Sequence, residues 1–190
     1  MSAQTDGLPA RTIYCHSFDP AETDKLLSAV GDLAERLRIE YPVVPPVDAE
    51  RLPKTPHDEV TSYLRSLLPG SQTADRPAPE ILENKLILVR LSPSDPFVSE
   101  AKEHSPVIGW GYAIPRRVAV VWHDNPSLIW HETLHLLGAK DCYNRFGMNK
   151  CPEPRCLMRW FPMSQLGDGQ LYLCGKNVRR IAAPPPPEEG

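Results

Sequence analysis

Two histidines with a glutamate beside the first constrain this 190-residue chain more than any other feature. His131 and His135 are four residues apart in the stretch from Ser127 to Asp141, which reads SLIWHETLHLLGAKD. On an α-helix this spacing puts both imidazoles on one face, where they can bind one zinc ion. Glu132 is rotated by about 100° from His131 around the helix axis. We therefore expect Glu132 to reach a metal-bound water rather than the metal itself.

The flanking residues predict that this stretch is a helix packed against a core. Asp124-Asn125-Pro126 supplies capping side chains and a proline at the position where a helix start accepts one. Trp130, Leu134 and Leu137 then recur at helical spacing and form an apolar stripe. One face of the helix is therefore expected to pack in the core, while another presents the two histidines.

A third metal ligand is expected just after this helix. Gly138 accepts the positive φ that ends a helix, and Asp141 follows three residues later. With His131 and His135, Asp141 completes three protein ligands and leaves a fourth position open for water or substrate, as a catalytic zinc site requires. The alternative is that Asp141 is a solvated turn residue, since aspartate is common in turns.

The rest of the chain alternates between expected strands and helices. We expect strands at 12–18, 85–91 and 117–122, and helices at 19–38 and 57–68. Residues 40–46 are expected to be extended, and 109–114 to be an edge strand or a loop. The alternation predicts an α+β or α/β layer followed by irregular, cysteine-rich structure. The proline-rich tail, 184–190, is expected to be disordered.

Four of the five cysteines lie in the last quarter of the chain, at Cys142, Cys151, Cys156 and Cys174. The N-terminus, MSAQTDGLPARTIYCHSFD, lacks the charged segment and apolar run of a secretory signal, so we expect a cytoplasmic protein. Thiols are normally reduced there. The clustered cysteines are therefore interpreted as metal ligands or buried residues, with free thiols or a disulfide as the alternatives.

The residues from His131 onward resemble the metzincin metallopeptidases. That family has the pattern H-E-x-x-H-x-x-G-x-x-H and then a Met-turn, whose methionine lies beneath the metal without binding it. This chain has H-E-T-L-H-L-L-G-A-K-D, with Asp141 in place of the third histidine, as in snapalysin-like metzincins. Met158, in Cys156-Leu157-Met158, matches the Met-turn methionine.

Within the metzincins the closer resemblance is to archaemetzincins. These have a cysteine directly after the third ligand, a C-x-M at the Met-turn and a C-x-x-C farther on, and their four cysteines hold a structural zinc. Cys142 and Cys156-Leu157-Met158 match the first two elements, although they are farther apart than in the family. Asn177 stands where the C-x-x-C has its second cysteine. Cys151 is extra, and with Cys174 it is the candidate to complete a four-cysteine zinc site.

The resemblance implies an α+β fold with a mixed twisted sheet, an active-site helix and a cysteine-rich C-terminal subdomain that carries the Met-turn. Residues 1–183 would form one zinc metallopeptidase domain, with 12–138 as its upper part and 139–183 as its lower part. The implied cofactors are a catalytic zinc, held by the two histidines and Asp141, and a second, structural zinc at the cysteines.

The implied activity is hydrolysis of peptide bonds in a peptide or protein substrate, through a metal-bound water activated by Glu132. Tyr143 and Tyr172 are candidate hydrogen-bond donors to the transition state, since Trp160 occupies the place of such a tyrosine in some metzincins. His123 either lines the cleft or is structural. One alternative is a weakly active or inactive zinc-binding protein that retains the fold, because a carboxylate ligand makes zinc a weaker Lewis acid. A pure interaction module built on a four-cysteine zinc would leave Glu132 unexplained.

Composition argues against two other classes of partner. The formal net charge of −3 does not match the basic footprint of a nucleic-acid-binding protein. No apolar stretch approaches the ~20 residues that a membrane-spanning helix needs. We therefore expect no nucleic-acid partner and no membrane partner, and we expect a monomer.

Overall fold

The computed structural model describes residues 9–68, 80–104, 111–114, 117–143, 148, 150–159 and 170–183. Trp160 and the tail expected to be disordered, 184–190, lie outside the described residues. Within them, the strands are β1 (Arg11–Ser17), β2 (Val47–Arg51), β3 (Leu86–Arg90), β4 (Gly111–Ile114) and β5 (Val118–Val121). The helices are α1 (Pro20–Glu40), α2 (His57–Ser66), α3 (Pro96–His104), α4 (Pro126–Leu136) and α5 (Gly175–Ala182), with a 3₁₀ turn at Glu80–Leu82.

The described strands form one mixed sheet in the order β2-β1-β3-β5-β4. β1 pairs in parallel with both β2 and β3, β3 pairs in parallel with β5, and β4 pairs antiparallel with β5. The expected α+β class with a mixed sheet is therefore confirmed. The segment 109–114, predicted as an edge strand or a loop, supplies the edge strand β4. The apolar run at 85–91 supplies β3, the central strand.

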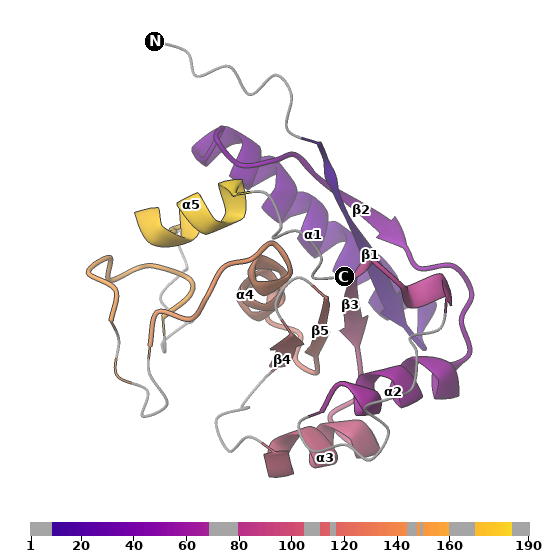
Figure 1. The fold of residues 1–190 in the computed structure, drawn as a ribbon. Coiled ribbons are helices and arrows are strands. Elements are labelled where there is room, and N and C mark those ends of the chain that lie inside the picture. Colours follow the sequence, from indigo (N-terminus) through magenta and orange to yellow (C-terminus); the bar gives the residue numbers. More distant parts are fainter. Residues whose placement is uncertain are drawn as a thin grey trace, which may run out of the picture.

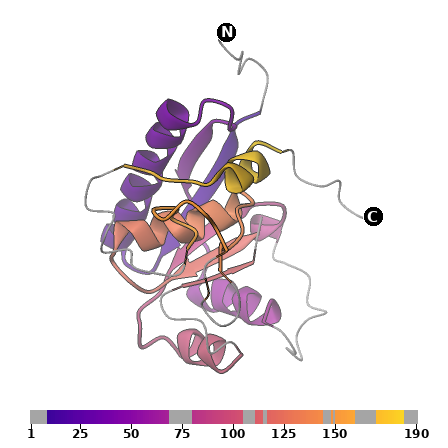
Figure 2. The same ribbon diagram turned by 90° about the vertical axis from the view of Figure 1, so that its left-hand side faces the viewer.

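The sheet separates two hydrophobic cores, because neighbouring residues of a strand point to opposite faces. Leu88 of β3 belongs to the core beneath α1 and α4, whereas Ile87 and Val89 belong to the core beneath α2 and α3. The helices divide in the same way: α1, α4 and α5 lie on one side of the sheet, and α2 and α3 on the other (Figure 1 and Figure 2). β3 and β5 are therefore covered on both faces, which explains their continuous apolar sequences.

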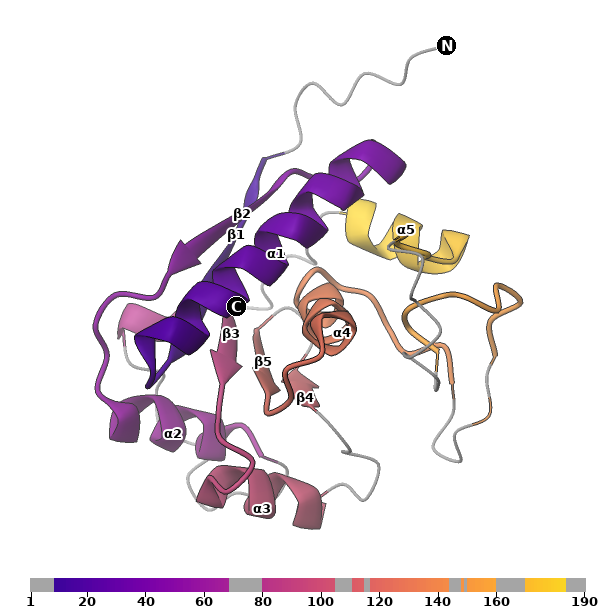
Figure 3. The same ribbon diagram turned by 180° about the vertical axis from the view of Figure 1, so that it is seen from behind.

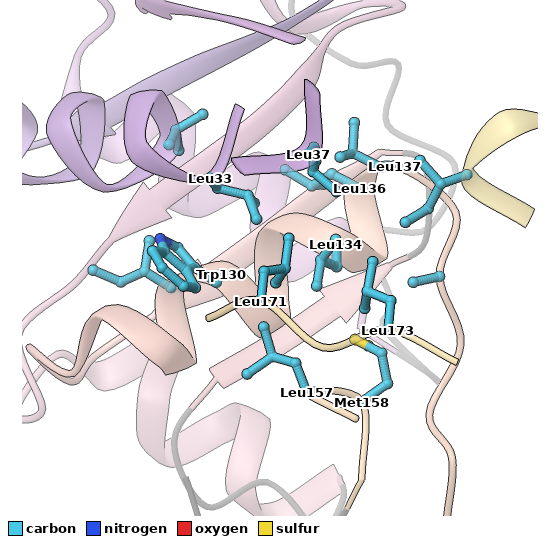
Figure 4. Packing of buried hydrophobic residues seen from close by; sticks show 14 of the residues in the cluster. Leu33, Leu37, Trp130, Leu134, Leu136, Leu137, Leu157, Met158, Leu171 and Leu173 are labelled. Carbon is cyan, nitrogen blue, oxygen red and sulfur yellow. The ribbon is translucent and has the colours of Figure 1, made fainter. Parts of the chain in front are cut away.

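α4 packs beside α1 on the sheet (Figure 3). The indole Nε1 of Trp130 donates a buried hydrogen bond of 2.8 Å to the backbone oxygen of Ala29 in α1. Leu134 and Leu137 are fully buried, as the apolar stripe predicts. In Figure 4, Leu134 lies in the same apolar cluster as the leucines of α1 and Met158. This packing fixes the helix that carries both histidines.

Three elements were not predicted from the sequence: β2, α3 and α5. α5 corrects the expectation of irregular structure throughout the cysteine-rich end, because the chain becomes helical directly after Cys174. Among the described residues, no helix combines the length and apolarity needed to cross a membrane.

Candidate metal centres

The start of α4 is built as its sequence predicts. Asn125 is the N-cap in extended conformation, and its side-chain oxygen accepts a hydrogen bond of 2.9 Å from the backbone N–H of Ser127. Pro126 follows at the first helical position, where its missing N–H costs nothing. His123 lies just before this cap, and its Nδ1 accepts a hydrogen bond of 3.3 Å from the backbone N–H of Asn125.

The end of α4 is a glycine-terminated turn that sends the chain back toward the histidines. Gly138 has a φ of 102°, which confirms the conformation expected of it. Its N–H donates to the oxygen of His135 at 2.9 Å, and the N–H of Ala139 donates to the oxygen of Leu134 at 2.9 Å. This pair of bonds is a Schellman motif, which satisfies carbonyls that the helix end leaves without intrahelical partners. The turn places Asp141 beside the helix.

Both histidine rings are fixed from behind by backbone carbonyls. His131 Nδ1 lies 2.8 Å from the oxygen of Leu157, and His135 Nδ1 lies 3.0 Å from the oxygen of Ala139. A carbonyl oxygen only accepts, so each Nδ1 carries the hydrogen and each neutral ring keeps its lone pair on Nε2. Donation of the distal N–H to a carbonyl is the usual support of a metal-binding histidine.

Asp141 completes a three-ligand group. Its Oδ1 lies 3.3 Å from Nε2 of His131 and 3.3 Å from Nε2 of His135. Ligands at bond lengths of about 2.0–2.1 Å in a tetrahedron are separated by about 3.3–3.4 Å, so these two distances fit one zinc-sized ion. The structure thus brings together all three predicted ligands in positions able to hold a metal ion. The histidines are buried, whereas the Asp141 side chain is 38% exposed and leaves the site accessible.

The charges of the site depend on one another. Burial raises the pKa of the Glu132 carboxyl above its usual range, although the two histidines oppose that shift. Burial lowers the pKa of His135, but the hydrogen bond to Asp141 and the charge of Glu132 outweigh it and raise the pKa to about 9. For Asp141, burial acts upward, yet the hydrogen bonds from His131 and His135 hold its pKa well below the usual range. His131, His135 and Asp141 thus favour a positive charge between them. A divalent cation would provide that charge while both imidazoles stay neutral.

The Glu132 carboxylate is held against the edge strand β4. An ideal Cβ built on Gly111 would lie 2.5 Å from Oε1 of Glu132 and 2.7 Å from its Cδ and Cγ. Glu132 is 8% exposed, so the carboxylate fills space that any other residue at position 111 would need. The contact of Gly111 with Glu132 was not predicted from the sequence. A glycine within a strand can mark such a close approach, but nothing in the sequence identifies the neighbour.

The four C-terminal cysteines form a second group. The Sγ atoms of Cys142, Cys151, Cys156 and Cys174 all lie within 4.8 Å of one another. Cys142 Sγ is 3.6 Å from Cys174 Sγ and 4.0 Å from Cys156 Sγ. Tetrahedral zinc with Zn–S bonds of about 2.3 Å separates its sulfurs by about 3.8 Å, whereas a disulfide needs about 2.05 Å. The spacing fits a tetrahedral metal, and all four residues are free thiols in the structure. Cys151, the cysteine that the family pattern does not contain, is thus a member of the group.

Asn177 is structural where the family pattern has a cysteine. It is fully buried on α5, and its Oδ1 accepts from the N–H of Lys140 at 3.0 Å. Its Nδ2 donates to the oxygen of Lys140 at 2.9 Å and lies 3.4 Å from Cys142 Sγ. The amide therefore ties α5 to the residue that precedes Asp141. A cysteine could not make both of these backbone bonds.

The thiols differ in their readiness to ionise. Burial raises the pKa of Cys142 well above its usual range, and the neighbouring cysteines add to the shift. Burial likewise raises the pKa of Cys156 to about 12. Cys174 has the reverse balance, because hydrogen bonds from the Asn177 N–H and the other thiols outweigh burial and lower its pKa. Metal binding would therefore have to displace several protons from this cluster.

The two candidate tyrosines and the candidate Met-turn methionine lie in different parts of the structure. Tyr143 is partly buried and hydrogen-bonded to Asp141, so it lies at the three-ligand group, and burial raises its pKa. Tyr172 instead bonds Arg155 and Gln170. Met158 is fully buried in the cluster below α4, beside Leu157 and Leu173 (Figure 4).

Comparisons with protein-family models and with curated proteins identify no relative of this chain. No protein-family model matches the chain, and a search of the curated proteins returns no match.

Proposed function

We propose that this protein is a zinc-dependent metallopeptidase of the metzincin type, which hydrolyses peptide bonds in a peptide or protein substrate. The observation that carries the proposal is the pair of 3.3 Å distances from Asp141 Oδ1 to Nε2 of His131 and of His135. A zinc ion between these three atoms would replace the hydrogen bonds that the two histidines make to Asp141 and would leave both imidazoles neutral. The same helix carries Glu132, a carboxylate that a purely structural metal site does not need.

The residues divide the chemistry among themselves. The histidines and Asp141 would hold zinc, which lowers the pKa of a coordinated water toward about 7 and polarises the scissile carbonyl. Glu132 takes the proton from the attacking water and later passes it to the leaving amine. Burial of its carboxylate supports this role, because a raised pKa brings the group closer to the working range of a general base. Tyr143 is the proposed hydrogen-bond donor to the developing oxyanion.

The cysteine cluster is proposed as a second, structural zinc site. A Cys₄ site is closed, with no position for substrate, and contributes to folding. Met158 is proposed as the Met-turn methionine, a support for the metal site from its apolar side. Its complete burial below α4 is consistent with that role.

The first experiment is zinc stoichiometry, measured by atomic absorption on the wild type and on the His131→Ala/His135→Ala double variant. We expect two zinc ions per chain, falling to one in the double variant. A stoichiometry that is the same in both proteins would refute the proposed catalytic site. A decrease from one to none would keep that site and refute the structural zinc.

Turnover is tested separately with Glu132→Gln, which keeps the size of the side chain and removes the base. We expect peptide hydrolysis to be lost while both zinc ions remain bound. Wild-type rates in this variant would refute the mechanism. A wild type that binds two zinc ions but cleaves no member of a peptide library would be a non-catalytic zinc protein.

A further inference from the structure

Asp141 lies outside any helix or strand, and its backbone is positioned through its two neighbours in the chain, Lys140 and Cys142. On one side, the backbone of Lys140 is fixed by both atoms of the Asn177 amide, at 3.0 and 2.9 Å. On the other side, the N–H of Cys142 donates to the oxygen of Met158 at 2.6 Å. Cys142 also places its sulfur in the cysteine cluster, directly after the metal-ligating carboxylate. The cluster therefore fixes one end of the segment that presents the third ligand.

The carbonyl that orients His131 also lies next to the cluster in the chain. That carbonyl belongs to Leu157, which follows Cys156 in the chain. The N–H of Leu157 donates to the oxygen of Tyr172 at 2.9 Å, and Cys174 follows two residues later. Cys174 in turn accepts on its oxygen from the N–H of Asn177 at 2.9 Å, which returns the chain of contacts to Lys140. Cys142, Cys156 and Cys174 thus each lie within a few residues of a contact that shapes the hydrolytic site.

We propose that the cysteine cluster is a positioning unit for the hydrolytic metal site, so that the affinity of His131, His135 and Asp141 for zinc depends on a metal ion at the cysteines. The proposal rests on the proposed function in treating both groups as metal sites. It adds that the two sites are energetically coupled through the backbone at 140–142 and 156–158. Cysteine occupancy would then regulate the hydrolytic site.

The physical reason is that a metal site with three protein ligands tolerates only a small displacement of any one ligand. α4 fixes both histidines, whereas Asp141 lies beyond the helix. Its side chain, which is 38% exposed, contacts the histidines, but its backbone is positioned through Lys140 and Cys142. Without an ion at the cysteines, no covalent or coordinate bond joins the four thiols, and the loops that carry Cys142 and Cys156 lose their common anchor. Loss of residues that support metal ligands typically costs 10- to 100-fold in metal affinity. We expect a loss in this range.

The test removes one cysteine that touches neither a hydrolytic ligand nor the Leu157 carbonyl. Cys151→Ala takes one thiol from the cluster, and Cys15→Ala is the matched control, because Cys15 is also buried but lies on β1 outside the cluster. Zinc affinity of the hydrolytic site is measured by competition with a chelator on the full-length protein. Cobalt substitution identifies the sites, because thiolate-to-cobalt absorption reports the cysteine cluster alone.

In Cys151→Ala we expect the cysteine-bound ion to be lost and zinc affinity at the hydrolytic site to fall 10- to 100-fold. Cys15→Ala should keep both ions and the wild-type affinity. Loss of the cysteine-bound ion with hydrolytic-site affinity within twofold of the wild type would overturn the proposal. The measurement does not use turnover, so absence of peptide cleavage would count against the proposed function and not against the coupling.

A second measurement needs no variant and decides the matter if Cys151→Ala fails to fold. Coupling between two binding sites is reciprocal. Removal of zinc from the hydrolytic site of the wild type with dipicolinate should therefore weaken zinc binding at the cysteines by the same 10- to 100-fold factor. An unchanged affinity of the cysteine cluster after that removal would overturn the proposal.

Discussion

Gly111 offers the sharpest test of how Glu132 is positioned. In Gly111→Ala, the new Cβ would lie 2.5 Å from Oε1 of Glu132, whereas ordinary contact begins at 3.4 Å. The carboxylate would have to move by 3.4 − 2.5 = 0.9 Å, or β4 would have to move away from α4. A misplacement of about 1 Å can reduce turnover by about 100-fold. Because the clash involves Glu132 and neither histidine, we expect kcat to fall by about that factor while the zinc content stays unchanged.

The control is Gly31→Ala in α1, where an added Cβ meets nothing within 4 Å. The same substitution in a helix interior is expected to stabilise the protein, by up to about 1 kcal/mol, and to leave turnover unchanged. If Gly111→Ala keeps kcat within threefold of the wild type, the argument that this glycine makes room for the catalytic carboxylate is wrong. Loss of zinc along with activity would also contradict it, because the damage would then lie at the metal ligands.

A double-mutant cycle separates this contact from any general harm to the edge strand, and it needs no activity. Overpacking of a filled site typically costs about 1–3 kcal/mol, so Gly111→Ala should lower the free energy of unfolding by that amount. In a Glu132→Ala background the three atoms that clash are absent, and the cost should nearly vanish. An equal cost in both backgrounds, measured by denaturant unfolding, would show that Gly111 is required for some other reason.

Three further perturbations follow from the same geometry. Gly138→Ala should lower the free energy of unfolding by about 1 kcal/mol or more in denaturant titrations, because a φ of 102° strains any side chain. Asn177→Ala should weaken zinc binding at the cysteines and at the hydrolytic site together, as measured by chelator competition, because it frees Lys140 from α5. Asp141→His should move the acidic limb of the pH–rate profile to lower pH, since a neutral third ligand leaves more positive charge on zinc to acidify its water; an unmoved limb would contradict this.

The parts of the fold that were predictable have a pattern set by their own side chains. β3 and β5 are buried on both faces, so their apolar runs are unambiguous. α4 has a capping residue, a proline at its start and a glycine at its end, and each acts as expected. The grouping of His131, His135 and Asp141 was predictable for a similar reason, because residues at positions i, i+4 and i+10 are brought together by one helix and one turn.

The elements that were missed are stabilised mainly by partners distant in sequence. β2 is an edge strand whose sequence, VDAER, is largely exposed, and it is held by backbone pairing to β1. Val47 and Ala49, which pack against the core, alternate with exposed Asp48 and Glu50, but two small apolar side chains in five residues make a weak strand signal. α5 is highly polar and buries only Asn177 and Ile181, so its helical state depends on the amide bonds to Lys140 and on burial of Ile181 in the core cluster. The close contact of Gly111 with Glu132 is likewise a property of the assembled fold.

The H-E-x-x-H helix by itself makes only part of a metal site. α4 supplies two of the proposed ligands and the proposed base. The carbonyl that orients His131 comes from Leu157, and the third proposed ligand comes from the segment after Gly138. The space that holds the Glu132 side chain is left by Gly111 of β4. Each of these contributions is fixed by a different part of the chain: the cysteine cluster, the glycine-terminated turn and the edge strand. A chance H-E-x-x-H on a surface helix would lack all three, and their convergence on one helix is the strongest physical reason to regard this motif as a metal site.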